Sequence, residues 1–296
     1  QMCIRDSLST LCFLLVSCFM FFADAGTRIV VLGSSTAAGA GVSDSNRAWV
    51  NQYRTYLQSI DPTNTVTNLA KGGYTTCAIM PTGTDPYNTG NHILEVDTER
   101  NITKALSLSP NAIIINMPTN DVSNGIPVAT QMKHFATIID LAKAAGVKVW
   151  ITTSQPHNFG EKYDGPYNEE HQPDIWKQAA RDQFKELTDS ILNKYGEYAL
   201  DFYTPIATED GYSFIRPEYD SGDGVHLNDA AHDILFNIVK NANIPEIAGS
   251  TPVEISTTPI YINFGPAEAG LDSWNNVNNQ ASGYRAVSYT HLRAHE

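Results

Sequence analysis

The sequence is poor in positive charge. It has 19 Lys and Arg residues against 32 Asp and Glu residues, so its formal net charge is -13. Nucleic acids and anionic membranes are polyanions that attract basic proteins, and we therefore do not expect either to be the main partner. Charged residues make up only 17% of the chain and hydrophobic residues 42%, which is the balance of a globular protein with a full core.

Cysteine is also scarce. Of the four cysteines, three lie within the first 25 residues, and only Cys77 lies further along the chain. Removal of the first segment would leave Cys77 alone, so we expect no disulfide framework. No Cys, His and Glu residues cluster with the spacing of metal ligands, and we expect neither a metal nor a cofactor.

The long apolar run LSTLCFLLVSCFMFF covers residues 8–22. It is short for a transmembrane helix but has the length of a signal-peptide core, and ADA (23–25) offers a small-residue cleavage site. Residues 1–25 therefore predict a signal peptide and export, to a periplasm or out of the cell. A buried helix is one alternative, and lipoprotein processing at Cys18 is another, which the apolar FMFF that follows disfavours.

Both ends of the chain resemble translated sequencing adapters, QMCIRDS at 1–7 and AVSYTHLRAHE at 286–296, and we expect both to be artefactual. Between them, 26–246 predicts one main domain. Residues 247–257 are rich in Pro, Ser and Thr and predict a linker. Residues 258–285 alternate like β-structure and predict the start of a truncated β-rich domain, of a kind that often binds carbohydrate in secreted enzymes.

Short apolar or β-branched runs alternate with helical periodicity along the main domain. The predicted strands are 28–32, 65–69, 112–117, 147–152 and 198–202. The predicted helices are 47–59, 98–107, 128–145, 174–195 and 229–241. Strands that alternate with helices indicate a parallel sheet covered on both faces. The sequence therefore predicts an α/β fold, a three-layer α/β/α sandwich with a five-stranded, flavodoxin-like parallel sheet.

Four polar loops that contain Gly, Asn or Asp follow predicted strands or precede the last helix. They are GSST (33–36), AKGGYTT (70–76), PTND (118–121) and SGDGVHLND (221–229). Ligands of such folds bind at the carboxyl ends of the strands. We therefore expect the four loops to meet at one edge of the sheet.

The GSST loop suits either a phosphate-binding turn or a turn that presents a nucleophile. A Walker loop needs a lysine after its last glycine, and none follows Gly39 or Gly41. A dinucleotide-binding fingerprint needs closer glycines and an acidic residue after the second strand, where Asn68 stands. The nucleophile is favoured, although serine is also a common helix N-cap at such a turn.

The DGVH motif supplies a base for a hydroxyl nucleophile. A serine hydroxyl reacts only when a positioned group takes its proton. The three-residue spacing keeps Asp223 and His226 in one loop, where the carboxylate can hold one ring nitrogen while the other faces the serine. These two residues could instead be metal ligands, but no further ligands stand out.

Taken in order, the four loops resemble the sequence blocks of the GDSL/SGNH hydrolase superfamily. GSST resembles the first block, NLAKGGYTT the second, PTND the third and DGVH the last. The resemblance covers about residues 28–240. It implies that Ser35 is the nucleophile, with Ser34 as the alternative if the register differs by one, and that His226 and Asp223 complete a catalytic triad.

The same resemblance implies an oxyanion hole. Its donors would be the backbone N–H groups of Ser35 and Gly73 and the side-chain amide of Asn120. Pro118 stands where the third block usually has glycine. Proline has no N–H, so this position cannot donate to the hole, and the Asn120 side chain supplies the donor there.

The implied activity is the hydrolysis of carboxylic esters through an acyl-enzyme, without metal or cofactor. We expect a small-molecule or polysaccharide ester with a short acyl group, such as acetyl, and a monomeric enzyme. A lipase, lysophospholipase or thioesterase on the same scaffold and a non-catalytic glycan-binding module remain alternatives. The aromatic-rich loop 157–176 could form a wall of the pocket, and His157 within it could contact the substrate.

Overall fold

The computed structural model describes residues 26–117, 119–158, 174–209 and 214–249. Contacts divide the chain into one unit, Gln1–Val253, and a second unit, Glu254–Glu296. The second unit, with the predicted β-rich segment, lies outside the described residues, as does the predicted signal peptide. Within the described ranges, no helix is both long and apolar enough to cross a membrane.

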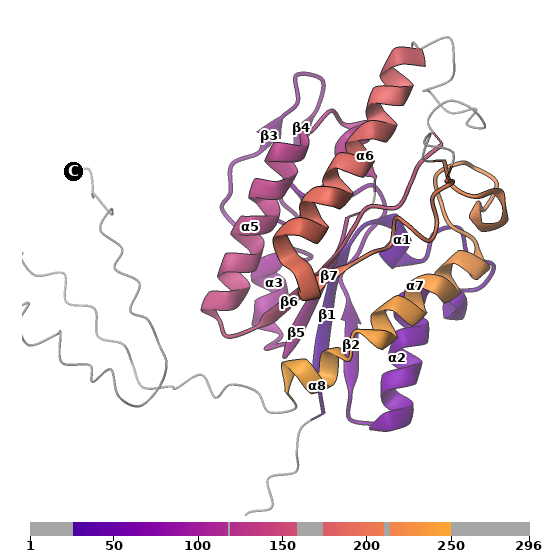
Figure 1. Cartoon of the computed structure of the whole chain (residues 1–296). Helices are drawn as coiled ribbons and strands as arrows, with labels where there is room; N and C mark the ends of the chain where they lie inside the picture. The colour runs from indigo at the N-terminus through magenta and orange to yellow at the C-terminus, as the bar shows by residue number, and fades with distance from the viewer. Residues whose placement is uncertain (1–25, 118, 159–173, 210–213, 250–296) are drawn as a thin grey trace, which may run out of the picture. The chain divides into compact units, whose positions relative to one another are not determined.

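Five parallel strands form the sheet that the sequence predicts. They are β1 (Arg28–Gly33), β2 (Thr65–Asn68), β5 (Ala112–Asn116), β6 (Lys148–Thr152) and β7 (Ala199–Leu200). Their order across the sheet is β2-β1-β5-β6-β7, and every neighbouring pair is parallel (Figure 1). This is the flavodoxin-like order, so the predicted fold class is confirmed.

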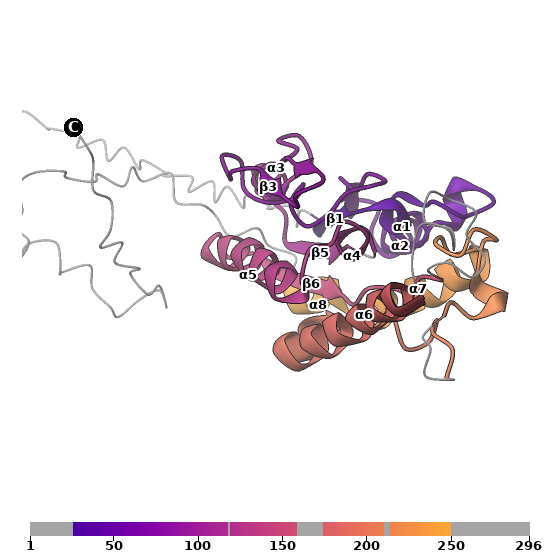
Figure 2. The ribbon, with the colours of Figure 1, turned by 90° about the horizontal axis from the view of Figure 1, so that it is seen from above.

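Helices cover both faces of the sheet (Figures 1 and 2). One layer holds α2 (Trp49–Ile60), α7 (Asp229–Asn241) and α8 (Ile244–Ala248), and the other holds α3 (Ile102–Ser107), α5 (Val128–Ala144) and α6 (Asp174–Tyr195).

Strand residues alternate between the two layers, as the pleat of a strand requires. On β1, Ile29 and Val31 pack into the core shared with α2 and α7, whereas Val30 and Leu32 pack into the core shared with α3 and α5. All four are buried. Apart from Arg28, the side chains of β1 are apolar or absent, as expected for a strand that is covered by helices on both faces.

Some elements differ from the prediction. Helix α3 begins at Ile102 rather than at residue 98, because the Asn101 side chain accepts a hydrogen bond from Lys104 N and caps the helix there. A two-stranded antiparallel sheet of β3 (Tyr87–Asn88) and β4 (Ile93–Leu94) was not predicted. Two-residue strands carry no measurable periodicity, so the sequence offers no signal for them.

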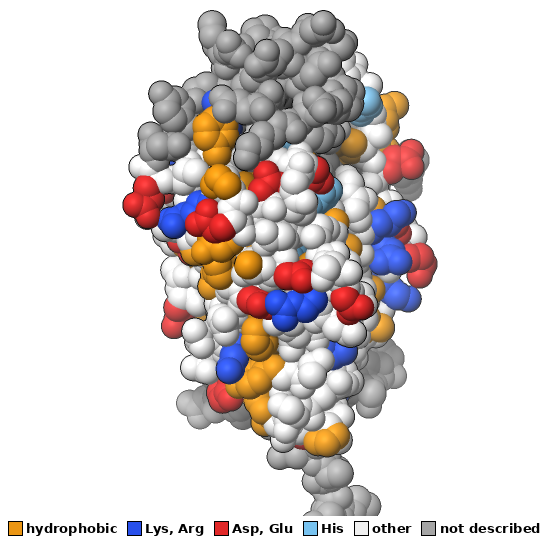
Figure 3. Space-filling model, turned by 90° about the vertical axis from the view of Figure 1, so that its right-hand side faces the viewer, with side chains coloured by type: hydrophobic (Ala, Val, Ile, Leu, Met, Phe, Trp, Pro, Cys, Tyr) orange, Lys and Arg blue, Asp and Glu red, His pale blue; other side chains and the backbone are white. Residues whose placement is uncertain are grey.

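The chain after β1 is tied to the start of α7. In η1 (Ser45–Arg47), Arg47 forms ion pairs with Asp229 at 3.5 Å and with Asp233 at 2.6 Å. Ser43 donates to Asp229 from both its N–H and its hydroxyl, at 2.9 and 2.5 Å. The face in Figure 3 accordingly shows acidic and basic side chains side by side. Exposed pairs add little stability, but these bring the segment after Ser35 to the helix that follows His226.

Candidate active site

The GSST loop is a tight turn from β1 into the short helix α1 (Ser35–Ala38). Gly33 is required there, because a Cβ at this position would lie 2.7 Å from Ala37 Cβ and 2.9 Å from Asn116 O. Ser34 N donates to Asn116 O at 3.1 Å and fixes the turn to the end of β5. The turn therefore places Ser35 on the first residue of a helix, at the carboxyl edge of the sheet.

The two serines of this turn have different environments. Ser34 is 0% exposed, and its Oγ accepts a hydrogen bond from Asn120 Nδ2 at 2.6 Å. Ser35 is 9% exposed, and no side chain or backbone group of the described residues binds its hydroxyl. The Ser35 hydroxyl is therefore the one of the pair that is free to react and reachable from outside.

The turn at Gly72 and Gly73 passes beside the nucleophile turn. A Cβ at Gly72 would lie 3.8 Å from Ser35 Cβ. Gly73 has φ +83°, in the left-handed region that favours glycine, and open space around its missing Cβ. Within the described part of the chain, no acceptor takes the Gly73 N–H. This N–H is therefore available to a ligand.

Asn120 begins the short helix α4 (Asn120–Ser123) and reaches both of these turns. Its Nδ2 donates to Ser34 Oγ at 2.6 Å and to Tyr74 O at 2.9 Å. An amide nitrogen has two hydrogens, so both donors of the predicted oxyanion residue are in use in this structure. An oxyanion would have to share one of them, and the same bonds hold the amide in a fixed place between the turns.

A buried carboxylate next to Asn120 holds the Gly73 turn in place, which the sequence did not indicate. Asp121 accepts hydrogen bonds from Thr76 N at 3.0 Å to each oxygen and from Thr76 Oγ1 at 2.5 Å. Thr76 Oγ1 also lies 2.7 Å from His134 Nδ1. Burial raises the pKa of Asp121 to about 6, against the opposing effect of these hydrogen bonds.

Asp223 and His226 form the pair that their spacing predicts. Asp223 Oδ2 lies 2.6 Å from His226 Nδ1, and Oδ1 accepts from His226 N at 2.7 Å and from Val225 N at 2.9 Å. Burial alone would raise the pKa of Asp223, but these hydrogen bonds outweigh it and hold the pKa below its ordinary value. An ionised carboxylate at Nδ1 keeps the proton there and leaves Nε2 as the basic nitrogen.

The His226 loop packs against the segment that follows the nucleophile. A Cβ at Gly41 would lie 2.9 Å from His226 Cβ and 2.3 Å from Leu227 O, so only glycine permits this approach. Among the described residues, no hydrogen bond joins the Ser35 hydroxyl to His226 Nε2. Such contacts are often long before substrate binds, so this geometry leaves a base role for His226 open.

The segment after β6 supports the same loop, and the sequence did not single out its role. Asn158 N donates to Gly224 O at 2.8 Å, and its side chain binds Asp220 and the Ile215 N–H. His157 is buried beside the Phe184 ring, and burial lowers the pKa of His157 to about 3. A neutral, buried imidazole of this kind fits a role in packing rather than in contact with substrate.

Pro118 and most of the predicted 157–176 wall lie outside the described residues.

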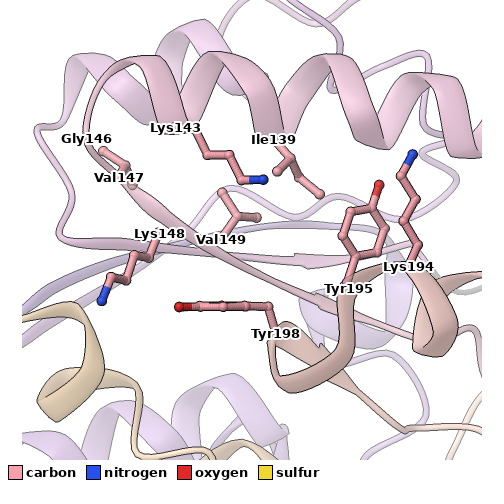
Figure 4. A pocket seen from close by; sticks show the side chains of 9 residues that line it. All are labelled: Ile139, Lys143, Gly146, Val147, Lys148, Val149, Lys194, Tyr195 and Tyr198. Atoms are coloured by element: carbon pink, nitrogen blue, oxygen red, sulfur yellow. The ribbon is translucent and has the colours of Figure 1, made fainter. Parts of the chain in front are cut away.

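The described residues line hollows at two different places on the surface. One, of about 450 Å³, is lined by the turn at Gly73 and by residues 93–98, so it opens beside the candidate site. The other, of about 410 Å³, lies between α5, the end of α6 and the amino end of β6 (Figure 4). Its lining includes Lys143 and Tyr195 but no serine, histidine or carboxylate. The chemistry-bearing side chains are therefore at the opposite edge of the sheet.

Over the described ranges, no group of three or more His, Cys, Asp or Glu side chains is arranged to hold a metal ion. The loops instead bring together a free hydroxyl, an acid–base pair, and backbone and amide donors. This set is suited to acyl transfer, in which a hydroxyl attacks a carbonyl and donors stabilise the oxyanion.

Comparison with solved structures identifies proteins of the same fold. Among them are a candidate acylhydrolase from Bacteroides fragilis and a GDSL-like lipase from Bacteroides thetaiotaomicron. The first is 20% identical with a TM-score of 0.51, over 75% of this chain and 88% of that one. The second is 19% identical with a TM-score of 0.50, over 75% and 89%. No curated protein sequence matches the chain.

The model of the GDSL-like lipase/acylhydrolase family matches residues 31–234. The chain belongs to this family. The resemblance to the GDSL/SGNH hydrolases that the four loops suggested is thereby confirmed, and the protein is placed among the acyl-hydrolysing enzymes.

Proposed function

We propose that the protein is a serine esterase that hydrolyses carboxylic esters at Ser35 through an acyl-enzyme. The observation that carries the proposal is the 2.6 Å contact between Asp223 and His226, in a loop packed against the segment that follows Ser35, whose hydroxyl is the free one of the GSST turn. This pairing orients the imidazole and leaves Nε2 to act as the base.

In the first half of the reaction, His226 Nε2 takes the proton of the Ser35 hydroxyl as Oγ attacks the ester carbonyl. The tetrahedral oxyanion receives hydrogen bonds from the N–H groups of Ser35 and Gly73 and from the Asn120 amide. Each such donor contributes about 100- to 1000-fold to the rate. The intermediate then collapses, and the leaving alcohol takes the proton from His226.

In the second half, His226 takes a proton from water as the water oxygen attacks the acyl-enzyme carbonyl. The same donors receive the second oxyanion. Collapse of this intermediate breaks the bond to Ser35, which regains its proton from His226, and the carboxylic acid leaves. The residues of this chain supply every proton transfer, so the mechanism needs no further group.

We further propose that the substrate carries a short acyl group, such as an acetyl ester on a polysaccharide, and that the enzyme acts as an exported monomer. Support for the substrate comes from the hollow beside Gly73, which is lined by Tyr74, Glu95 and Asp97 together with the apolar side chains of Ala78, Ile93, Leu94 and Val96. The carboxylates and the tyrosine suit a hydroxyl-rich alcohol part. Support for export comes from the apolar run at 8–22 and the small residues at 23–25.

Hydrolysis of p-nitrophenyl acetate by the wild type and by Ser35→Ala tests the reaction. We expect turnover by the wild type and loss of at least a thousandfold in the variant, since removal of one triad member leaves little catalysis. No turnover by the folded wild type would support the alternative of a non-catalytic glycan-binding module. A series of acyl chain lengths, with acetylated xylan, separates an acetyl esterase from a lipase or thioesterase.

A further inference from the structure

The side chain of Gln155 joins the two halves of the candidate active site. Its Oε1 accepts a hydrogen bond from Thr36 Oγ1 at 2.6 Å, and its Nε2 donates to Val225 O at 2.7 Å. Thr36 is the residue after Ser35, and Val225 is the residue before His226. One amide therefore connects the neighbour of the nucleophile to the neighbour of the base.

The orientation of this amide follows from its partners. Val225 O can only accept a hydrogen bond, so the NH₂ group of Gln155 must face it. The carbonyl of Gln155 then faces Thr36, whose hydroxyl is the donor. Gln155 is 2% exposed and Thr36 1% exposed, so water does not compete for these bonds. Buried, satisfied polar groups of this kind hold one geometry, because the alternatives leave a donor or acceptor unpaired.

The backbone of Gln155 is positioned by the sheet. Gln155 lies three residues after the end of strand β6, on the same segment whose Asn158 N donates to Gly224 O at 2.8 Å. The segment after β6 therefore contacts the Asp223–His226 loop at two backbone carbonyls, those of Gly224 and Val225. Of the two contacting residues, Asn158 and Gln155, Gln155 also contacts the helix that begins at Ser35, through Thr36.

We propose that Gln155 is a positioning residue, which sets the distance from His226 to Ser35 and to the leaving oxygen by spanning Thr36 and Val225. This inference rests on the proposed function, because it assigns a role within the same reaction. Gln155 touches neither substrate nor reacting atoms, and it acts through the two segments that it joins.

Two esters with different leaving groups test this role. The p-nitrophenolate of p-nitrophenyl acetate leaves without a proton, whereas the ethoxide of ethyl acetate needs the proton held by His226. Displacement of His226 therefore harms the second substrate more. For Gln155→Met, we expect kcat/KM to fall about tenfold with p-nitrophenyl acetate and about 100-fold with ethyl acetate.

Gln131→Met is the matched control. Gln131 is also buried, at 1% exposed, and its Nε2 also binds a backbone carbonyl, Ile126 O at 2.8 Å. We expect Gln131→Met to lower stability without changing the ratio of the two kcat/KM values.

Thr36→Val removes one of the two Gln155 hydrogen bonds while keeping the side-chain shape, and it replaces Gln155→Met as the test variant if Gln155→Met does not fold. We expect it to change the ratio in the same direction by about threefold.

A stability cycle tests the tether without relying on activity. Unfolding equilibria of the wild type, Thr36→Val, Gln155→Met and the double variant should show a coupling of about fivefold or more in the unfolding constant. The proposal would be overturned if Gln155→Met and Gln131→Met had the same ratio of the two kcat/KM values, or if the changes in unfolding free energy of Thr36→Val and Gln155→Met were additive in the double variant. Inactive wild-type protein would instead contradict the proposed function, and the cycle would still decide whether the tether exists.

Discussion

Asn120 Nδ2 lies 2.6 Å from Ser34 Oγ, so the first serine of the GSST turn is bound to the amide that we propose for the oxyanion hole. The second serine carries the free hydroxyl. In the proposed mechanism, Ser34 holds Asn120 in place and Ser35 is the nucleophile. This division assigns separate effects to two adjacent residues of the same type.

Substitution of each serine by alanine separates the two roles. We expect Ser35→Ala to abolish p-nitrophenyl acetate hydrolysis, because it removes the nucleophile. We expect Ser34→Ala to reduce kcat by about tenfold, because Asn120 loses one of the two bonds that orient it. Initial-rate kinetics on both purified variants measure this. If Ser35→Ala kept its activity and Ser34→Ala lost it, Ser34 rather than Ser35 would be the nucleophile.

Asp223→Asn tests the orientation of the imidazole. An asparagine amide turned toward His226 Nδ1 favours the wrong tautomer, in which Nε2 carries the proton and cannot act as a base. We expect kcat to fall on the order of a thousandfold while Ser35 stays in place. Steady-state kinetics at several pH values measure the effect, and a decrease of less than about threefold would show that the carboxylate is dispensable.

Gly73→Ala tests the oxyanion turn, and Gly83→Ala is its matched control. Both glycines have φ near +90°, and neither Cβ would meet another atom within 4 Å. Alanine should therefore cost each site about 1–2 kcal/mol of backbone strain. Alanine keeps the N–H, but relief of the strain shifts the turn, and a small displacement of a reacting group can cost about 100-fold. Only the turn at Gly73 lies beside Ser35, so we expect kcat to fall by about this factor there and to stay unchanged in Gly83→Ala. Equal kcat values in the two variants would show that the reaction does not depend on the exact position of the Gly73 turn.

The Asp121–Thr76 contact predicts a large difference between two substitutions. Asp121→Ala leaves the Thr76 N–H buried without an acceptor and the Thr76 hydroxyl with His134 as its remaining partner, and we expect a loss of about 2–4 kcal/mol in the free energy of unfolding. Asp121→Asn keeps an acceptor oxygen and should cost less than half as much. Urea unfolding of both proteins measures this, and equal losses would mean that the carboxylate serves only to fill space.

His232 predicts how stability depends on pH. It is 0% exposed, its Nδ1 accepts from Trp49 N at 3.1 Å, and burial lowers the pKa of His232 to about 4. In the unfolded chain the His232 imidazole has its ordinary pKa of 6.5. Between pH 6.5 and 4 the unfolded chain therefore binds more protons than the folded protein. Stability should therefore fall as the pH falls through this window, by about 3 kcal/mol in full.

His232→Asn can keep an acceptor near the Trp49 N–H and removes the titrating ring. We expect denaturant unfolding at pH 7, 5.5 and 4.5 to show a shallower pH dependence in this variant than in the wild type. His92→Asn, which changes an exposed histidine, should leave the slope as it is. An unchanged slope in His232→Asn would show that this ring does not cause the acid sensitivity.

The sequence predicts those features that depend on neighbouring residues. The largely apolar strand at 28–32, the helix at 229–241 and the Asp223–His226 pair are each encoded within one short segment. For that reason their bounds or partners agree with the structure.

The sequence could not predict contacts between distant segments. Thr76 meets Asp121 across 45 positions, and Thr36 meets Gln155 across 119. Thr and Gln at these positions fit ordinary turns and surfaces equally well, and only the folded sheet brings them together. The different burial of Ser34 and Ser35 also depends on tertiary packing, so the motif alone left the two serines as alternatives.

Mapping of a covalent adduct tests the central claim most directly. After incubation of the wild type with a fluorophosphonate, peptide mass spectrometry should find a single phosphonylated residue, Ser35, because the proposed mechanism makes that free hydroxyl the nucleophile. An adduct on Ser34 or on another residue, or no adduct on an enzyme that hydrolyses esters, would contradict the account.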